Sequence, residues 1–166
     1  MSMRAIFGLS ILMSLVAFGL LTKLYLWPRL RILERRDALI PLVLLHTFRF
    51  IGLSFLVPGV VSPSLPSAWA APAAYGDLGA AILAVAATIA LSRRASFAIP
   101  LVWLFNVWGT VDLIFAYYQG FRVDLDASSL GATFFIPTAL VPLLLITHGL
   151  IFGCLVRPSA RASTVA

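Results

Sequence analysis

Long apolar runs, separated by short polar or proline-rich segments, organise this chain. A helix needs about 20 apolar residues to cross a bilayer, and five runs approach or exceed that length. We therefore expect an all-α integral membrane protein built as a bundle of five transmembrane helices. The helices are predicted at residues 5–26, 38–57, 77–91, 98–119 and 130–156. One transmembrane domain is expected over residues 1–157, followed by a disordered cytoplasmic tail at 158–166.

The segments between these runs carry signals of their own. Residues 58–76 hold four prolines and no charge, and a loop on the outer membrane surface is expected there. Asp77 then begins a short helix rich in Ala and Gly, where a carboxylate suits the N-terminal end of the helix dipole. Small residues let helices approach closely, so this helix is predicted at the centre of the bundle. Ser128 or Ser129 is expected to cap the last helix.

The composition excludes a soluble domain. Hydrophobic residues make up 61% of the 166 residues and charged residues only 11%, whereas a soluble domain has about 25% charged residues. The net charge of +6 suggests nucleic-acid binding in other contexts. Here the basic residues lie at the ends of the apolar runs, as membrane topology requires. We therefore expect the lipid bilayer, and no nucleic acid, as the partner of this protein.

The basic residues also predict an orientation. Cytoplasmic loops carry an excess of Lys and Arg, and one side holds nine basic residues against two on the other. This bias places the N-terminus outside and the C-terminus in the cytoplasm, in the cytoplasmic (inner) membrane of a bacterium. Because five helices are few for a complete transporter, a homo-oligomer or a larger membrane complex is expected. Anionic lipids are expected at the densest basic segment, which contains Arg29, Arg31, Arg35 and Arg36.

Five polar side chains interrupt the apolar runs, namely His46, Arg49, Asn106, Asp112 and His148. Ionisable groups within membrane helices are costly and usually functional. Counted from one membrane side, His46, Asn106 and His148 lie eight or nine residues deep, which is roughly 12–14 Å at a helical rise of about 1.5 Å per residue. They are predicted to share one cavity. Asp112 is the only acid predicted at depth, so Arg49 is expected to pair with it.

Helical spacing extends this polar layer. His46 and Arg49 share one face of an α-helix, and Phe50 and Leu53 are expected to continue that face. The fourth predicted helix carries further polar residues at helical spacing after Asn106. The predicted ligand or proton path consists of His46, Arg49, Asn106, Thr110, Asp112, Tyr117 and His148.

No motif in the chain names a reaction. There is no glycine-rich phosphate loop, no zinc-binding Cys/His spacing and no HExxH or GxSxG sequence. A buried Arg–Asp pair flanked by histidines is the kind of group found along intramembrane proton or solute paths. The first hypothesis is therefore a multi-pass inner-membrane protein that transports a small solute or protons.

Three alternatives stay open at this point, and whether the protein is an enzyme is one of the open questions. A ligand-binding protein is the first, in its sharpest form with a b-type haem between His46 and His148, because neutral imidazole is a usual axial ligand of haem iron. A membrane-embedded enzyme acting on a lipid or isoprenoid is the second, with a histidine as general acid or base. An accessory or scaffold protein without a ligand is the third.

Overall fold

The computed structural model describes residues 1–157, and this part of the chain is helical with no strand. The tail predicted at 158–166 lies outside the described residues. Five helices are long and apolar enough to cross a membrane, which confirms the number expected from the sequence. Their bounds are Met3–Leu30, Arg35–Leu56, Ser67–Ser92, Ala98–Arg122 and Ile136–Val156.

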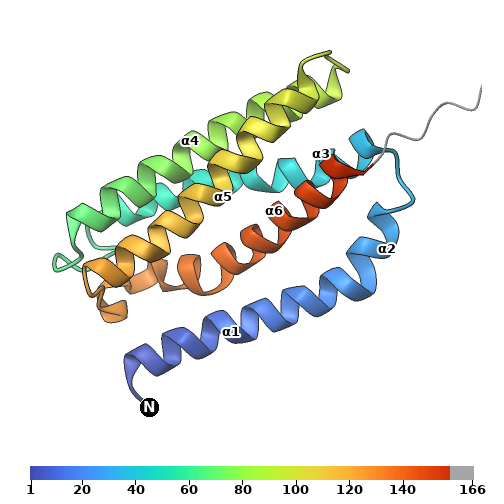
Figure 1. Cartoon of the computed structure of the whole chain (residues 1–166). Coiled ribbons are helices and arrows are strands. Elements are labelled where there is room, and N and C mark those ends of the chain that lie inside the picture. The colour runs from blue at the N-terminus through green and yellow to red at the C-terminus, as the bar shows by residue number, and fades with distance from the viewer. Residues whose placement is uncertain (158–166) are drawn as a thin grey trace, which may run out of the picture.

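The five helices run back and forth in one antiparallel bundle (Figure 1). The first long helix consists of α1 (Met3–Leu21), a π-type turn η1 (Thr22–Leu26) and α2 (Trp27–Leu30), and the second consists of α3 (Arg35–Leu45) and the 3₁₀ helix η2 (His46–Leu56). The third is α4 (Ser67–Ser92), and the fourth is α5 (Ala98–Arg122). A 3₁₀ segment η3 (Ala127–Phe134) follows, and the fifth long helix consists of the π-type turn η4 (Ile136–Leu140) and α6 (Val141–Val156). We call the end where α1 begins the N-terminal end. The opposite, basic end holds Arg35, Arg93, Arg94 and Arg157.

Helix α4 packs closely against its neighbours through small residues, as predicted, but it lies on the side of the bundle opposite α1 rather than at its centre (Figure 1). It contacts η2, α3 and α5, and eight of its eleven buried residues are alanine. The predicted start of this helix at Asp77 was wrong, because α4 begins at Ser67 with Pro66 at its N-cap. Pro72 lies inside the helix. Prolines near a helix start remove few hydrogen bonds, so they did not mark a loop over the whole of 58–76.

Helix α1 stands at the edge of the bundle. None of its residues is buried, and it packs along α6 and η4, on the side away from α4 (Figure 1). The remaining long helices form a compact group of four. Helix α6 lies between α1 and α5 and contacts both (Figure 1). The cavity described below lies on the α1 side of this group.

The 3₁₀ helix η2 positions the most important side chain in the molecule. Residues at i and i+3 eclipse one another in a 3₁₀ helix, and runs longer than three or four residues are uncommon. In η2 the pattern brings His46, Arg49, Gly52 and Phe55 onto one buried line. The expected α-helical face through Phe50 was wrong, because that side chain is 51% exposed. The repeat of three residues, rather than 3.6, decides which side chains are buried here.

A compact turn connects α5 with the last long helix. Asp126 is the N-cap of η3 and accepts hydrogen bonds from the Ser128 N–H at 3.0 Å and the Ser128 hydroxyl at 2.5 Å. The expectation that Ser128 or Ser129 caps the helix was therefore wrong, since the carboxylate takes that role and the Ser128 hydroxyl donates to it. These hydrogen bonds from Ser128 lower the pKa of Asp126.

Candidate functional site

Arg49 lies at the centre of a buried ionic cluster. Its side chain is inaccessible to solvent, and its guanidinium donates to three groups. The Nε–H donates to Asp77 Oδ1 at 2.7 Å, and Nη2 donates to Asp112 Oδ2 at 2.5 Å. Nη1 donates to the carbonyl of Gly109 at 3.1 Å. We call Arg49, Asp77 and Asp112 the arginine cluster. The predicted pair of Arg49 and Asp112 is confirmed.

The second carboxylate of this cluster was not predicted from the sequence. Asp77 was expected at the start of its helix, with access to water, and Asp112 as the only deeply placed acid. Because α4 begins ten residues earlier, Asp77 lies in its third turn and is only 7% exposed. One arginine therefore pairs with one buried and one partly buried carboxylate. When all three groups are ionised, the cluster carries one excess negative charge.

Glycines make the space that these side chains occupy. A Cβ atom on Gly52 would collide with the Asp77 carboxylate, and one on Gly76 would collide with Asp112. A Cβ on Gly109 would lie 2.7 Å from the His148 ring and 2.8 Å from Arg49 Nη1. Such approaches leave no room for any side chain larger than hydrogen. The three glycines therefore belong to the site, although none carries a functional group.

A second polar group, the histidine cluster, consists of His46, Asn106, Thr147 and His148. The two imidazole rings are in contact, with centroids 4.1 Å apart. Asn106 Oδ1 lies 2.7 Å from His148 Nδ1, and the Thr147 hydroxyl lies 3.0 Å from His46 Nε2. The two histidines and Asn106 converge as predicted. The predicted cavity between them is corrected, because their side chains pack against one another and do not line the cavity described below. Thr147 is a further member that was not predicted.

The hydrogen bonds of Asn106 assign the proton on His148. Its amide nitrogen donates to the His148 carbonyl at 3.2 Å, so its amide oxygen faces the ring and accepts from Nδ1–H. The neutral ring then keeps a lone pair on Nε2, which has no hydrogen-bond partner within residues 1–157. This nitrogen points to the position of the missing Gly109 Cβ, beside Arg49. The two clusters thus meet at Gly109.

The histidine pair does not fit a shared haem. Metal–imidazole nitrogen distances are about 2 Å, so a metal held between two rings would place the ring centroids roughly 6 Å apart. The observed separation is 4.1 Å at an interplanar angle of 45°, and Phe105 closes the space beside both rings. Since His46 and His148 touch each other directly, no macrocycle can lie between them. The hypothesis of a haem held between these two residues is therefore wrong for this geometry.

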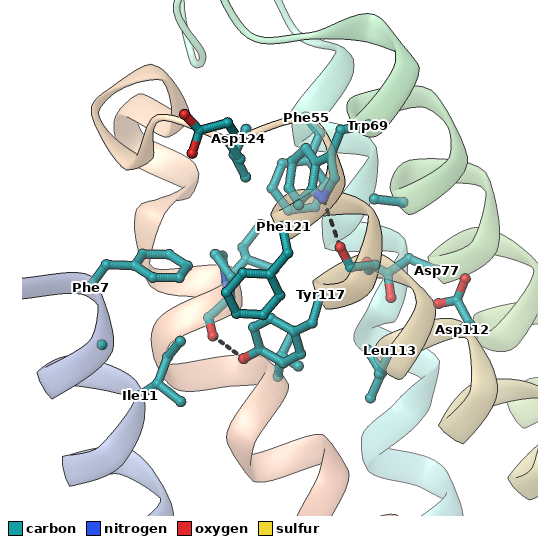
Figure 2. A pocket seen from close by; sticks show the side chains of 18 of the residues that line it. Phe7, Ile11, Phe55, Trp69, Asp77, Asp112, Leu113, Tyr117, Phe121 and Asp124 are labelled. Carbon is teal, nitrogen blue, oxygen red and sulfur yellow. Dashed lines mark hydrogen bonds between the residues drawn. The ribbon is translucent and has the colours of Figure 1, made fainter. Parts of the chain in front are cut away.

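A cavity of about 310 Å³ lies in the N-terminal half of the bundle, bordered by α1, α4, α5 and η4. Asp77 and Asp112 lie on one side of it, and Asp124 lies at the opposite edge (Figure 2). Asp124 forms an exposed ion pair with Arg4 at 2.7 Å. The cavity therefore runs from an exposed ion pair to the two carboxylates of the arginine cluster.

Aromatic side chains form much of the cavity wall (Figure 2): Phe7, Phe55, Trp69, Tyr117 and Phe121. The polar atoms of two of them are already in use. The Trp69 Nε1–H donates to the Ala116 carbonyl at 2.9 Å, and the Tyr117 hydroxyl donates to the Pro137 carbonyl at 2.6 Å. Their rings, rather than their donors, are left to line the cavity.

Two residues of the predicted path lie outside both clusters. Tyr117 belongs to the cavity wall. The Thr110 hydroxyl donates to the Asn106 carbonyl of its own helix at 2.7 Å, which is the usual way for a helical threonine to satisfy its hydroxyl. Of the residues that the sequence did not identify, Asp77 had the clearest signal, because it follows Gly76 as a lone acid in an apolar helix.

No curated protein and no solved structure matches this chain. A family model described as "Domain of unknown function (DUF8737)" matches residues 6–156. The match covers both polar clusters and nearly the whole cavity wall, with Arg4 outside it. The chain belongs to this family of proteins with a domain of unknown function, DUF8737.

Proposed function

We propose that this protein is a five-span protein of a bacterial cytoplasmic membrane, with the N-terminus outside and the C-terminus in the cytoplasm. The support is the distribution of charge over the bundle. The basic end carries most of the arginines, and cytoplasmic loops are the ones enriched in basic residues. The N-terminal end, with Arg4 and Arg122, would then face outward, and the cavity would open on that side.

We propose that the protein transports a small solute or protons, with the arginine cluster as its exchange site. The observation that carries this proposal is the unequal charge of the cluster beside a cavity. Two carboxylates share a single guanidinium, and an uncompensated charge within a bilayer is costly. The cluster therefore favours the uptake of one positive charge, either a proton or a cation, and the cavity supplies a route to it.

The local structure of η2 supports movement at this site. A long 3₁₀ segment within a helix often marks a functional hinge, and η2 carries Arg49 itself. Conversion of η2 toward α-helical geometry would rotate Arg49 relative to His46, because the two residues would no longer eclipse. Such a change would move the guanidinium with respect to both carboxylates and alter their affinity for a positive charge.

Proton flux into proteoliposomes tests the transport proposal. Purified protein is reconstituted with a pH-sensitive dye inside the vesicles, and a pH jump is applied. We expect flux above that of empty vesicles, and its loss in Asp77→Asn and Asp112→Asn. Asp37→Asn makes the same chemical change at an exposed position in the first turn of α3 and should keep the flux. Equal flux in Asp112→Asn and in the wild type would reject the proposed site.

We also propose that anionic lipids bind at the basic end. Arg29 and Arg31 are exposed, and the intervening loop exposes Ile32 and Leu33, which suits a segment at the membrane surface. Arg35 is less available because its guanidinium donates to the Arg157 carbonyl. Reduced retention of anionic lipid by the double variant Arg29→Gln/Arg31→Gln, measured by native mass spectrometry, would support this role, and unchanged retention would reject it.

A further inference from the structure

We propose that the cavity binds an organic ammonium cation with an apolar body, with its charge directed at Asp77 and Asp112. This inference rests on the proposed function, because it names the class of solute for the same site. Charge, wall chemistry and size each support it.

The charge at the inner side of the cavity is negative. Asp77 and Asp112 expose 10% and 14% of their side chains, whereas the side chain of Arg49 exposes none. A ligand in the cavity therefore meets carboxylate edges, with the guanidinium behind them. At the opposite edge Arg4 and Asp124 neutralise each other. A cation compensates the excess charge of the arginine cluster, while an anion would be repelled and a neutral molecule would leave the charge unbalanced.

The aromatic wall is suited to an ammonium group. A cation near the face of a Trp, Tyr or Phe ring is attracted by the ring quadrupole, and such rings recognise quaternary ammonium ligands. Trp69 and Tyr117 have already given their donors to backbone carbonyls, so their rings line the cavity and offer no free hydrogen-bond donor. Carboxylates beside aromatic rings thus favour a cation without strong hydration, which distinguishes an organic ammonium from a metal ion.

The volume sets the size of the ligand. Small-molecule sites usually measure about 300–1,000 Å³, so a cavity of about 310 Å³ suits a small compound with one ring or a short branched chain. Gly8 of α1 lines the cavity, and a Cβ at this position would meet no atom within 4 Å. This glycine therefore leaves space open at the cavity wall, and a large side chain there would fill part of the cavity.

Calorimetry on the purified full chain in detergent tests the inference, with three aromatic probes that differ in charge. Benzyltrimethylammonium is the cation, benzyl alcohol the uncharged relative and benzenesulfonate the anion. We expect the cation to bind at least tenfold more tightly than benzyl alcohol, and benzenesulfonate not to bind. Asp112→Asn should weaken binding of the cation at least tenfold, and Asp37→Asn should leave it unchanged. Equal binding of cation and alcohol, or full affinity in Asp112→Asn, would overturn the inference.

A second pair of variants keeps the test valid if Asp112→Asn does not fold. Gly8→Phe fills the cavity, and Gly19→Phe places the same side chain at an open position elsewhere on α1. Loss of benzyltrimethylammonium binding in Gly8→Phe alone would support the inference, and equal binding in both would overturn it. Cation binding without flux of either protons or benzyltrimethylammonium in proteoliposomes would preserve the inference and reject transport. Flux dependent on Asp112 without cation binding would reject the inference and preserve transport.

Discussion

The histidine cluster and the arginine cluster touch at Gly109, yet they differ in charge and surroundings. The four residues of the histidine cluster are at most 2% exposed, and the two imidazole rings pack against Phe105. As neutral groups they carry no net charge, and they make several hydrogen bonds with one another, although His46 Nδ1 and His148 Nε2 have no partner within residues 1–157. The arginine cluster carries an excess charge and borders a cavity. Burial of polar groups alone therefore does not identify a binding site, whereas unbalanced charge beside open space does.

The largest expected effect comes from removing the shared guanidinium. Arg49→Met leaves the buried Asp77 and the partly buried Asp112 without their cation, and breaking a buried ion pair by removing one partner costs about 3–5 kcal/mol. The triple variant Arg49→Met/Asp77→Asn/Asp112→Asn removes every charge of the cluster and should be more stable than Arg49→Met alone. Thermal unfolding in matched detergent measures both. A triple variant that loses the sum of the three single losses would mean that these groups do not interact.

The presence of Asp77 changes the expectation for Asp112. From the sequence, Asp112→Ala alone would strand Arg49 and should be less stable than the double variant Arg49→Ala/Asp112→Ala. In the structure Asp77 remains to balance Arg49, so the single variant keeps a neutral pair and the double variant strands Asp77. We therefore expect the opposite order of stability, with the double variant the less stable one.

A methyl group at Gly109 should disturb both clusters at once. In Gly109→Ala the new Cβ would lie 2.7 Å from the His148 ring and 2.8 Å from Arg49 Nη1, and overpacking of this kind costs about 1–3 kcal/mol. Gly149→Ala is the matched control, because a Cβ there meets no atom within 4 Å. Thermal unfolding should show a loss in the first variant and none in the second. Equal stability of the two variants would mean that the two clusters do not meet at Gly109.

Opposite responses of the two clusters would sharpen the comparison further. Asn106→Leu leaves the His148 Nδ1–H without its acceptor, and an unsatisfied buried group costs about 1–3 kcal/mol. Proton flux and benzyltrimethylammonium binding by the folded protein should stay at the wild-type level. Asp112→Asn should do the reverse, with flux and binding lost and most of the stability kept. If Asn106→Leu abolished flux at unchanged stability, the histidine cluster would be part of the transport path.

The sequence predicted the helices and the convergence of polar residues for a simple physical reason. Apolar length identifies a candidate span, and a constant rise per residue places His46, Asn106 and His148 at one depth. Depth carries no information on the direction of a side chain, so the contact between the two histidine rings was not foreseen. The 3₁₀ geometry of η2 also changed which residues are buried. An α-helical repeat from His46 would bury Phe50, whereas the observed repeat of three residues buries Phe55 and leaves Phe50 exposed.

Other parts of the site lay beyond sequence patterns. The start of α4 at Ser67 depends on alanines that extend the helix across Pro72, and this extension turned Asp77 from a helix-end residue into a buried partner of Arg49. The cavity depends on the position of α1 relative to α5, which no local pattern encodes. Membrane insertion and the orientation of the bundle remain predictions from the apolar helices and the distribution of basic residues.

The smallest effect on stability and binding is expected at Asp126. This carboxylate is exposed to solvent and accepts hydrogen bonds from Ser128 outside the bundle. Hydrogen bonds from Ser128 stabilise its charged form and lower its pKa. A lowered pKa contributes stability above the ordinary value for Asp, and this contribution is lost as the pH falls through the lowered pKa. Ser128→Ala should return the pKa toward its ordinary value, as followed by NMR titration of the Asp126 carboxyl carbon. Because the group is exposed, binding of benzyltrimethylammonium should not change. A change in binding would mean that the turn beside η3 is coupled to the arginine cluster, and the contrast between buried and solvated carboxylates would then fail.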